Sequence, residues 1–308
     1  MTTPPMSLRM AVSSLESLIS PNVGGLAARL RYSYRVVRQD WPKLSLLRDR
    51  GVDCHIATMQ QSGTHWLTHM LAVALAEAYD VPEPGDIDDR SLIGNRKHPA
   101  VYSHVPRIIQ THNIPSPLCH SAPLRRLLRF PKYIILLRDM RASLVSHYEK
   151  HHARRMTFAD YLRNDRLVGN PVRWDVWYRI RFLNAWHREI GRLPAEQTLV
   201  VCYEALQADP LRELQRVWSF LDLPEKEGLL ARAIERSTKE RMAKKETTAK
   251  PAKVIRKSSR HPFEWFTEDD RNYFTEVCRA FLKHHFDYDY TRWDTLGPAS
   301  LTQTSRAA

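Results

Sequence analysis

The chain has 308 residues, of which 43% are hydrophobic and 26% are charged, and its net charge is +13 at pH 7. This length allows a large buried core, and the composition excludes a low-complexity chain. No apolar run reaches the roughly eighteen residues of a membrane-spanning helix. The positive charge suits a nucleic acid, an anionic membrane surface or an anionic small molecule. No helix-turn-helix or aromatic-basic RNA pattern occurs, so we expect no nucleic-acid partner.

The four cysteines lie far apart and lack the paired spacing of metal ligands. Cys54 and Cys202 fall in apolar runs, where a reduced cysteine behaves as a small buried hydrophobe. The first residues do not resemble a signal peptide. We therefore expect a cytoplasmic location and no metal site.

Residues 1–49 are predicted to be a basic, helical N-terminal extension. Within them, residues 26–38 have apolar side chains at helical spacing with arginines between them. A basic amphipathic helix of this kind can lie on the inner face of a membrane as a peripheral contact. It can equally pack its apolar side on its own domain, and the sequence leaves both interpretations open.

An α/β pattern begins at residue 50. Short apolar runs predict strands, and periodic stretches between them predict helices. The strands are expected at 52–59, 107–111, 131–138 and 197–203, and the helices at 64–79, 140–151, 158–165, 174–191, 210–221, 226–237 and 267–285. This alternation predicts a single α/β domain over 50–292, with a central, mostly parallel sheet flanked by helices. Residues 293–308 would form a tail, and 238–262, which lack a period, a linker or a mobile loop over a site.

The segment from Gln60 to Trp66 lies between the first predicted strand and the first predicted helix. At such a turn the first backbone N–H groups of the helix have no partner within it, and the helix dipole favours an anion. Gly63 lets the main chain approach a phosphate closely, and the hydroxyls of Ser62 and Thr64 can add donors. The Walker A pattern is absent, and a tight capped turn would have the same appearance in isolation.

A second phosphate-binding pattern lies further along the chain. Arg138 ends the third predicted strand, and Ser146 follows eight residues later in a predicted helix. A guanidinium at the end of a strand can hold a phosphate in a fork, and a hydroxyl on the helix can complete the site. Arg138 and Asp139 could in isolation be a surface ion pair, but the occurrence of the two motifs in this order counts against that interpretation.

Together these segments resemble the PAPS-dependent sulfotransferases, which use 3′-phosphoadenosine 5′-phosphosulfate (PAPS) and release PAP. Their phosphosulfate loop, Y-P-K-S-G-T-T-W with a frequent T-H-W variant, is matched by Ser62 to Trp66. Thr111-His112 resembles the Thr-His that bears the family's catalytic base, and Tyr203-Glu204 resembles its Y-E-D-L segment. Residues 255–258 resemble its R-K-G loop, and the whole match covers about residues 50–290.

The resemblance implies a P-loop-like fold, PAPS as the sulfuryl donor, no metal, and a small-molecule or glycolipid acceptor with a hydroxyl or, less commonly, an amine. It implies that His112 is the general base, a role for which the pKa of imidazole is suited. Trp66 would stack on the adenine near Ser237, while His65 would have a packing or secondary role. The implied donor-binding residues are Gln61, Ser62, Gly63, Thr64, His65, Trp66, Arg138, Ser146, Tyr203, Ser237, Arg256, Lys257 and Ser258.

The chain departs from the family pattern at three positions. Gln61 replaces the loop lysine that steadies the bridging oxygen, Gln110 replaces a frequent lysine before Thr-His, and Ser258 replaces the glycine of R-K-G. Glutamine brings no charge, and the loss of one transition-state donor costs about 2.7–4 kcal/mol. Two alternatives therefore stay open: a slow or non-catalytic PAP-binding homologue, and an atypical nucleotide-dependent kinase.

Overall fold

The computed structural model describes residues 51–115, 120–163, 174–245 and 260–299. Its central sheet has five strands, all parallel, in the order β2-β3-β1-β4-β5. The strands are β1 (Cys54–Thr58), β2 (Ile93–Gly94), β3 (Ile108–Thr111), β4 (Lys132–Leu137) and β5 (Thr198–Cys202). The predicted α/β class with a parallel sheet is confirmed.

The central strands are apolar on both faces because helices cover both sides of the sheet. In β4, Tyr133, Ile135 and Leu137 belong to one buried cluster, whereas Ile134 and Leu136 belong to the other. Successive side chains of a strand point to opposite faces, so this single strand contributes to two cores. An uninterrupted apolar run is therefore what this position in the sheet requires.

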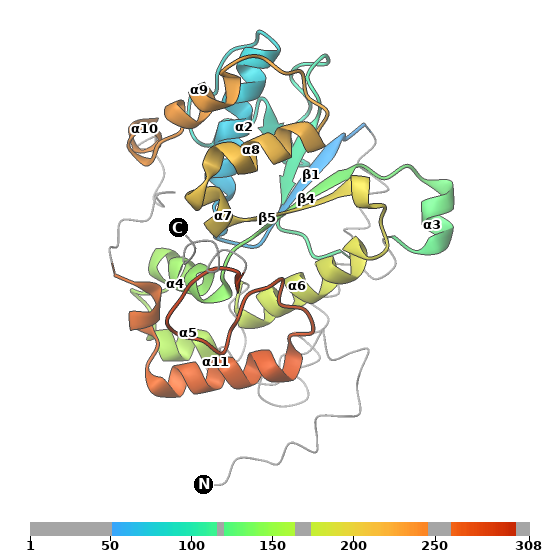
Figure 1. Ribbon diagram of the computed structural model, residues 1–308. Helices are drawn as coiled ribbons and strands as arrows, with labels where there is room; N and C mark the ends of the chain where they lie inside the picture. Colours follow the sequence, from blue (N-terminus) through green and yellow to red (C-terminus); the bar gives the residue numbers. More distant parts are fainter. Residues whose placement is uncertain (1–50, 116–119, 164–173, 246–259, 300–308) are drawn as a thin grey trace.

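Two layers of helices enclose the sheet (Figure 1). On one side lie α2 (Thr64–Ala78), α7 (Tyr203–Ala208), α8 (Pro210–Phe220), α9 (Leu229–Arg236) and α10 (Lys239–Lys245). On the other side lie α4 (Met140–His151), α5 (Phe158–Arg163), α6 (Val176–Ile190) and α11 (Glu268–Phe281), while α3 (Ala122–Leu127) lies at one edge. The short 3-10 helices are η3 (Ala195–Gln197) and η4 (Pro262–Trp265).

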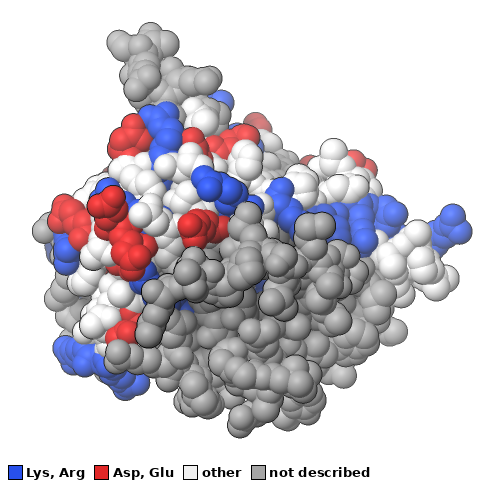
Figure 2. Space-filling view, turned by 90° about the horizontal axis from the view of Figure 1, so that it is seen from below, with Lys and Arg blue, Asp and Glu red and all other residues white. Residues whose placement is uncertain are grey.

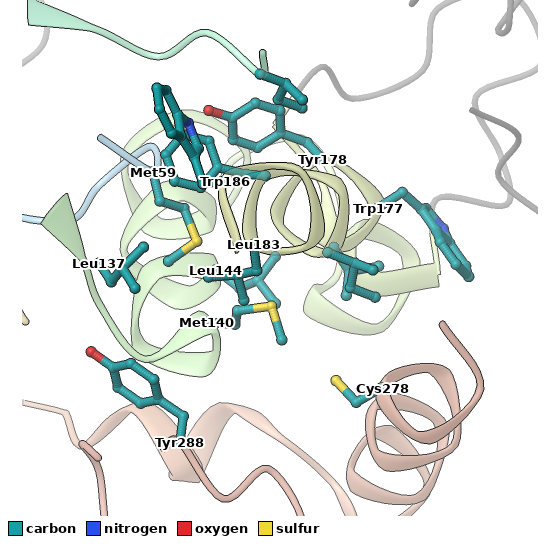
Figure 3. Packing of buried hydrophobic residues seen from close by; sticks show 14 of the residues in the cluster. Met59, Leu137, Met140, Leu144, Trp177, Tyr178, Leu183, Trp186, Cys278 and Tyr288 are labelled. Carbon is teal, nitrogen blue, oxygen red and sulfur yellow. The ribbon is translucent and has the colours of Figure 1, made fainter. Parts of the chain in front are cut away.

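The core on the α4 side fixes the helix that carries Ser146. Figure 3 shows Met140 and Leu144 of α4 converging with Leu183 of α6 and with Leu137 at the end of β4. All four side chains are fully buried. Because they pack between the sheet and α6, the position of α4 relative to the strand ends is set by the core.

The order of the strands brings the predicted motifs to one edge of the sheet. From β1, the chain forms β2 and β3 on one side and then crosses to β4 and β5 on the other. The carboxyl ends of parallel strands at such a switch point form a natural ligand crevice. Thr58, Thr111, Leu137 and Cys202 end four of the strands, and each is followed directly by a predicted site segment.

Several features of the fold differ from the sequence prediction or were missed by it, among them the short helix α7 and the two 3-10 helices. Residues 239–245 form α10 instead of a linker, and this helix buries only Met242, which gives no periodic signal. The short helix α3 buries no residue, and β2 has two residues, so neither produces a recognisable pattern. The extension 1–49 and the segment 246–259 lie outside the described residues.

The surface charge is distributed unevenly. On the face shown in Figure 2, basic side chains gather toward the edge that carries α3, and acidic and basic side chains are mixed at the opposite edge. Arg125 and Arg126 lie in the last turn of α3. Within the described residues no helix is both long and apolar enough to cross a membrane, and Cys54, Cys202 and Cys278 are free thiols.

Candidate active site

A cavity of about 700 Å³ opens at the carboxyl edge of the sheet. It lies between the start of α2, the end of β3, α4, the start of α7 and the α9–α10 junction. The described residues that line it are Gln60, Gln61, Gly63, Thr64, His65, Trp66, Arg90, Gln110, His112, Arg138, Ser146, Lys150, His151, Tyr203, Gln207, Ile234, Ser237, Thr238, Lys239 and Met242.

The loop before α2 needs its glycine. Gly63 is the N-cap residue of α2 and has φ +82°, a left-handed conformation that favours glycine. A Cβ atom at this position would lie 2.3 Å from Cδ2 of Tyr203, so no other residue fits without moving the ring. The start of this fifteen-residue helix lines the cavity, so its first N–H groups are placed where they can bind an anion.

Arg138, just after β4, and residues of α4 and α6 hold the loop through its carbonyl groups. Arg138 Nη1 donates to the carbonyl oxygen of Gln61 at 2.9 Å, and Ser143 Oγ donates to that of Gln60 at 2.7 Å. Ser143 Oγ in turn accepts from Nε of the buried Arg179 at 2.8 Å. The loop is thus pre-organised by side chains whose role the sequence did not reveal, since neither Ser143 nor Arg179 has a distinctive motif.

Arg138 is well placed to bind an anion. Its guanidinium lies 4.5 Å from the centre of the Tyr203 ring, which fixes its plane. Its Nε is buried and has no hydrogen-bond partner among the described residues. Buried donors of this kind are usually paired, so the arrangement fits an oxyanion such as a phosphate. Ser146 of α4 also lines the cavity, and its Oγ lies 3.5 Å from Oε1 of Gln61.

An aromatic wall forms the next part of the cavity. Trp66 packs edge-on against Tyr203, with 6.1 Å between ring centres, and its Nε1 donates to the carbonyl oxygen of Ser237 at 3.0 Å. The hydroxyl of Ser237 lies 2.8 Å from Nδ1 of His69 and is engaged there. Burial lowers the pKa of His69 to about 4, which keeps this imidazole neutral. The wall is a rigid apolar surface that a planar ring can contact.

His112 is held by the strand beside it. Its Nδ1 lies 2.9 Å from the carbonyl oxygen and 2.8 Å from Oγ1 of Thr58, and the latter hydroxyl accepts from Thr64 Oγ1 at 2.9 Å. A carbonyl oxygen can only accept, so the proton resides on Nδ1 and Nε2 is the nitrogen that can take up another proton. Tyr178 donates its hydroxyl to the carbonyl oxygen of His112 at 2.8 Å, which fixes the backbone as well.

His65 lies among charged groups, close to Asp88 and Arg90. Its Nδ1 is 3.7 Å from Oδ1 of Asp88, which also accepts from Arg90 Nη2 at 3.2 Å. Burial, followed by the charge of Arg90, lowers the pKa of His65 to about 4, while Asp88 opposes the shift and Lys150 and His112 add to it. His65 is therefore neutral near physiological pH.

The structure brings most of the predicted site residues together. Ser62, within the loop, is fully buried and is not among the described residues that line the cavity. Arg256, Lys257 and Ser258 lie outside the described residues. The predicted residues that line the cavity are Gln61, Gly63, Thr64, His65, Trp66, His112, Arg138, Ser146, Tyr203 and Ser237.

Several lining residues were missed by sequence reasoning, namely Arg90, Lys150, His151, Gln207, Ile234, Thr238, Lys239 and Met242. Arg90 lies in the irregular segment between α2 and β2, where no pattern marks it. Lys150 follows Ser146 by four residues on α4, so helical spacing could have indicated that it shares the face of Ser146. No group of three metal-binding side chains occurs within the described ranges.

A family model of the sulfotransferase domain matches residues 52–294. Sulfotransferase 1C2 of Oryctolagus cuniculus is 23% identical over 224 residues, covering 66% of this chain and 70% of the relative, and that of Rattus norvegicus is 22% identical over 262 residues, covering 77% and 82%. Mouse sulfotransferase SULT7A1 complexed with PAP superposes with a TM-score of 0.54 at 18% identity, over 80% of this chain and 92% of that one. Retinol dehydratase in a complex with retinol and PAP has a TM-score of 0.54 at 18% identity, over 80% and 87%.

The family match spans most of the chain, and the solved structures share its fold. The protein therefore belongs to the sulfotransferase family. It is an enzyme of the sulfotransferase class, whose general reaction is the transfer of a sulfuryl group.

Proposed function

We propose that the protein transfers a sulfuryl group from PAPS to a hydroxyl group of a small-molecule acceptor, with His112 as the general base. The observation that carries this proposal is the convergence of the Gly63 loop, Arg138 and His112 on one cavity. Mouse SULT7A1 and retinol dehydratase, which share the fold, were solved with PAP. Their complexes support the choice of donor.

The donor would bind along the start of α2 and the aromatic wall. The first N–H groups of α2 would receive the 5′-phosphosulfate, because the helix dipole favours anionic oxygens there. Arg138 and Ser146 would hold the 3′-phosphate, and Trp66 would offer its ring to the adenine. The unpartnered Arg138 Nε fits this assignment.

The transfer step requires a base on the side of the acceptor. The acceptor oxygen attacks the sulfur in line, the S–O bond to PAP breaks, and the acceptor proton goes to Nε2 of His112. Thr58 keeps the proton of the free enzyme on Nδ1, so that Nε2 is the basic nitrogen. The electron pair of the broken bond leaves on the PAP phosphate, near Gln61.

Gln61 raises the alternative of a slow enzyme. It can donate a hydrogen bond but supplies no charge to the bridging oxygen, where relatives use lysine. The second alternative from the sequence was an atypical nucleotide-dependent kinase, and no feature of the described cavity lining favours it.

Calorimetry and a transfer assay test the proposal. We expect PAP to bind to the full-length protein at least about tenfold more tightly than ATP with Mg²⁺, and labelled sulfate from PAPS to appear on hydroxyl acceptors. Tighter binding of ATP would overturn the nucleotide assignment. Tight binding of PAP without transfer to any acceptor of a broad panel would favour a non-catalytic homologue.

A further inference from the structure

The cavity has two chemically different ends. The end lined by Trp66, Tyr203, Ile234 and Met242 holds all the large apolar or aromatic side chains among its described lining residues. The other end surrounds His112 and is called here the acceptor end. Its described lining residues are Gln60, Gln61, His65, Arg90, Gln110, His112, Lys150 and His151, all of which can form hydrogen bonds. Trp174 packs edge-on against His112, with 5.9 Å between ring centres, but is not among the lining residues.

Two polar atoms of the acceptor end are unsatisfied. Oε1 of Gln60 and Nδ1 of His65 are buried and have no hydrogen-bond partner within the described part of the chain. A buried polar atom left unpaired costs about 1–3 kcal/mol, so such atoms usually meet a ligand or water. Both residues line the cavity, so an acceptor with hydroxyl groups can offer hydrogen-bond partners to their side chains, whereas an apolar acceptor offers none.

The charge of the cavity is one-sided. Its described lining contains Arg90, Arg138, Lys150 and Lys239, and no carboxylate. Arg138 and Lys239 lie toward the aromatic wall, while Arg90 and Lys150 lie at the acceptor end. Asp88 lies behind Arg90 and pairs with it, which holds the guanidinium in place.

Resting on the proposed function, we propose that the acceptor is a polyhydroxylated, sugar-like molecule that bears an acidic group. Its hydroxyls are bound by Gln60 and His65, and its acidic group is bound by Arg90 and Lys150, beside the reacting hydroxyl at His112. An apolar acceptor of the retinol kind, which was solved in retinol dehydratase, does not match this lining.

Matched pairs of p-nitrophenyl glycosides test the proposal. Each sugar is used in its neutral form and as the corresponding uronic acid, with 1-naphthol as the apolar acceptor. Binding to the protein saturated with PAP is measured by calorimetry, and transfer is measured with labelled PAPS. We expect the uronic acids to have the highest kcat/KM, at least about tenfold above their neutral partners.

Charge-removing variants locate the effect. Lys150→Gln and Arg90→Gln should each lower kcat/KM for the uronic acids by about tenfold and for the neutral glycosides by much less. Arg154→Gln removes one charge from an exposed residue just beyond α4 and should change neither value. Each variant is also titrated with PAP, because retained PAP affinity shows that the fold and the donor site are intact.

Each other outcome counts against the proposal in a distinguishable way. A preference for 1-naphthol, or no binding of any glycoside while PAP binds normally, would overturn the acceptor assignment alone. Equal losses of kcat/KM with acidic and neutral glycosides would show that Lys150 and Arg90 do not bind the acidic group. Failure of the unmodified protein to bind PAP would overturn the proposed function, and the inference with it.

Discussion

Replacement of Gly63 by alanine is the change whose consequences can be worked out most fully from the structure. The added Cβ would lie 2.3 Å from Cδ2 and 2.4 Å from Cε2 of Tyr203, far inside contact distance. The left-handed backbone at φ +82° adds a cost of about 1–2 kcal/mol for a residue with a side chain. The ring of Tyr203 must move, and it would then no longer lie under Arg138 or against Trp66.

We therefore expect Gly63→Ala to weaken PAP binding at least tenfold, about 1.4 kcal/mol, as measured by calorimetry. The midpoint of thermal unfolding should fall as well. Gly85→Ala is the matched control, because its nearest neighbouring atom is 4.0 Å away and no positive φ is involved. Unchanged PAP affinity in Gly63→Ala would refute the close packing of the loop against Tyr203.

Three further predictions concern charge, orientation and pH. Gln61→Lys should raise kcat by about a hundredfold, since one transition-state donor is worth about 2.7–4 kcal/mol; an unchanged kcat would contradict this role of the loop position. Thr58→Val should lower kcat about tenfold and leave PAP affinity intact, because it removes a hydroxyl that orients His112; a parallel loss of PAP affinity would indicate a structural role. Burial lowers the pKa of His55 to about 4 from 6.5, so the unfolded chain binds a proton that the folded chain does not as the pH falls below 6.5. Lowering the pH from about 7 to about 5 should therefore reduce the unfolding free energy of the unmodified protein by up to about 2 kcal/mol more than that of His55→Leu. Denaturant titrations at the two pH values measure this difference, and equal reductions in the two proteins would contradict it.

The sheet and the main motifs could be predicted because buried parallel strands have an unambiguous sequence. The strand bearing Ile134 and Leu136 must be apolar on both faces, and the segment after it begins with Arg138 in the expected place. The contact between Thr58 and His112 was not predicted. It depends on the register that pairs Ala57 with Thr111, which a one-dimensional pattern does not specify.

The acceptor end was hidden from sequence reasoning for a different reason. Arg90 lies in an irregular segment, where it pairs with Asp88 and lines the cavity. Lys150 was not identified from the sequence, although its spacing from Ser146 places both residues on one face of α4. The geometry of such irregular segments is set by tertiary packing, which a sequence pattern does not reveal.

The central claim is that His112 acts on the acceptor proton and not on donor binding. The most direct test compares PAP affinity and sulfate transfer in His112→Ala and in the unmodified protein. The account predicts that PAP affinity stays within about twofold while transfer falls by about a hundredfold or more. Transfer that persists at its full rate, or a loss of PAP affinity equal to the loss of transfer, would contradict it.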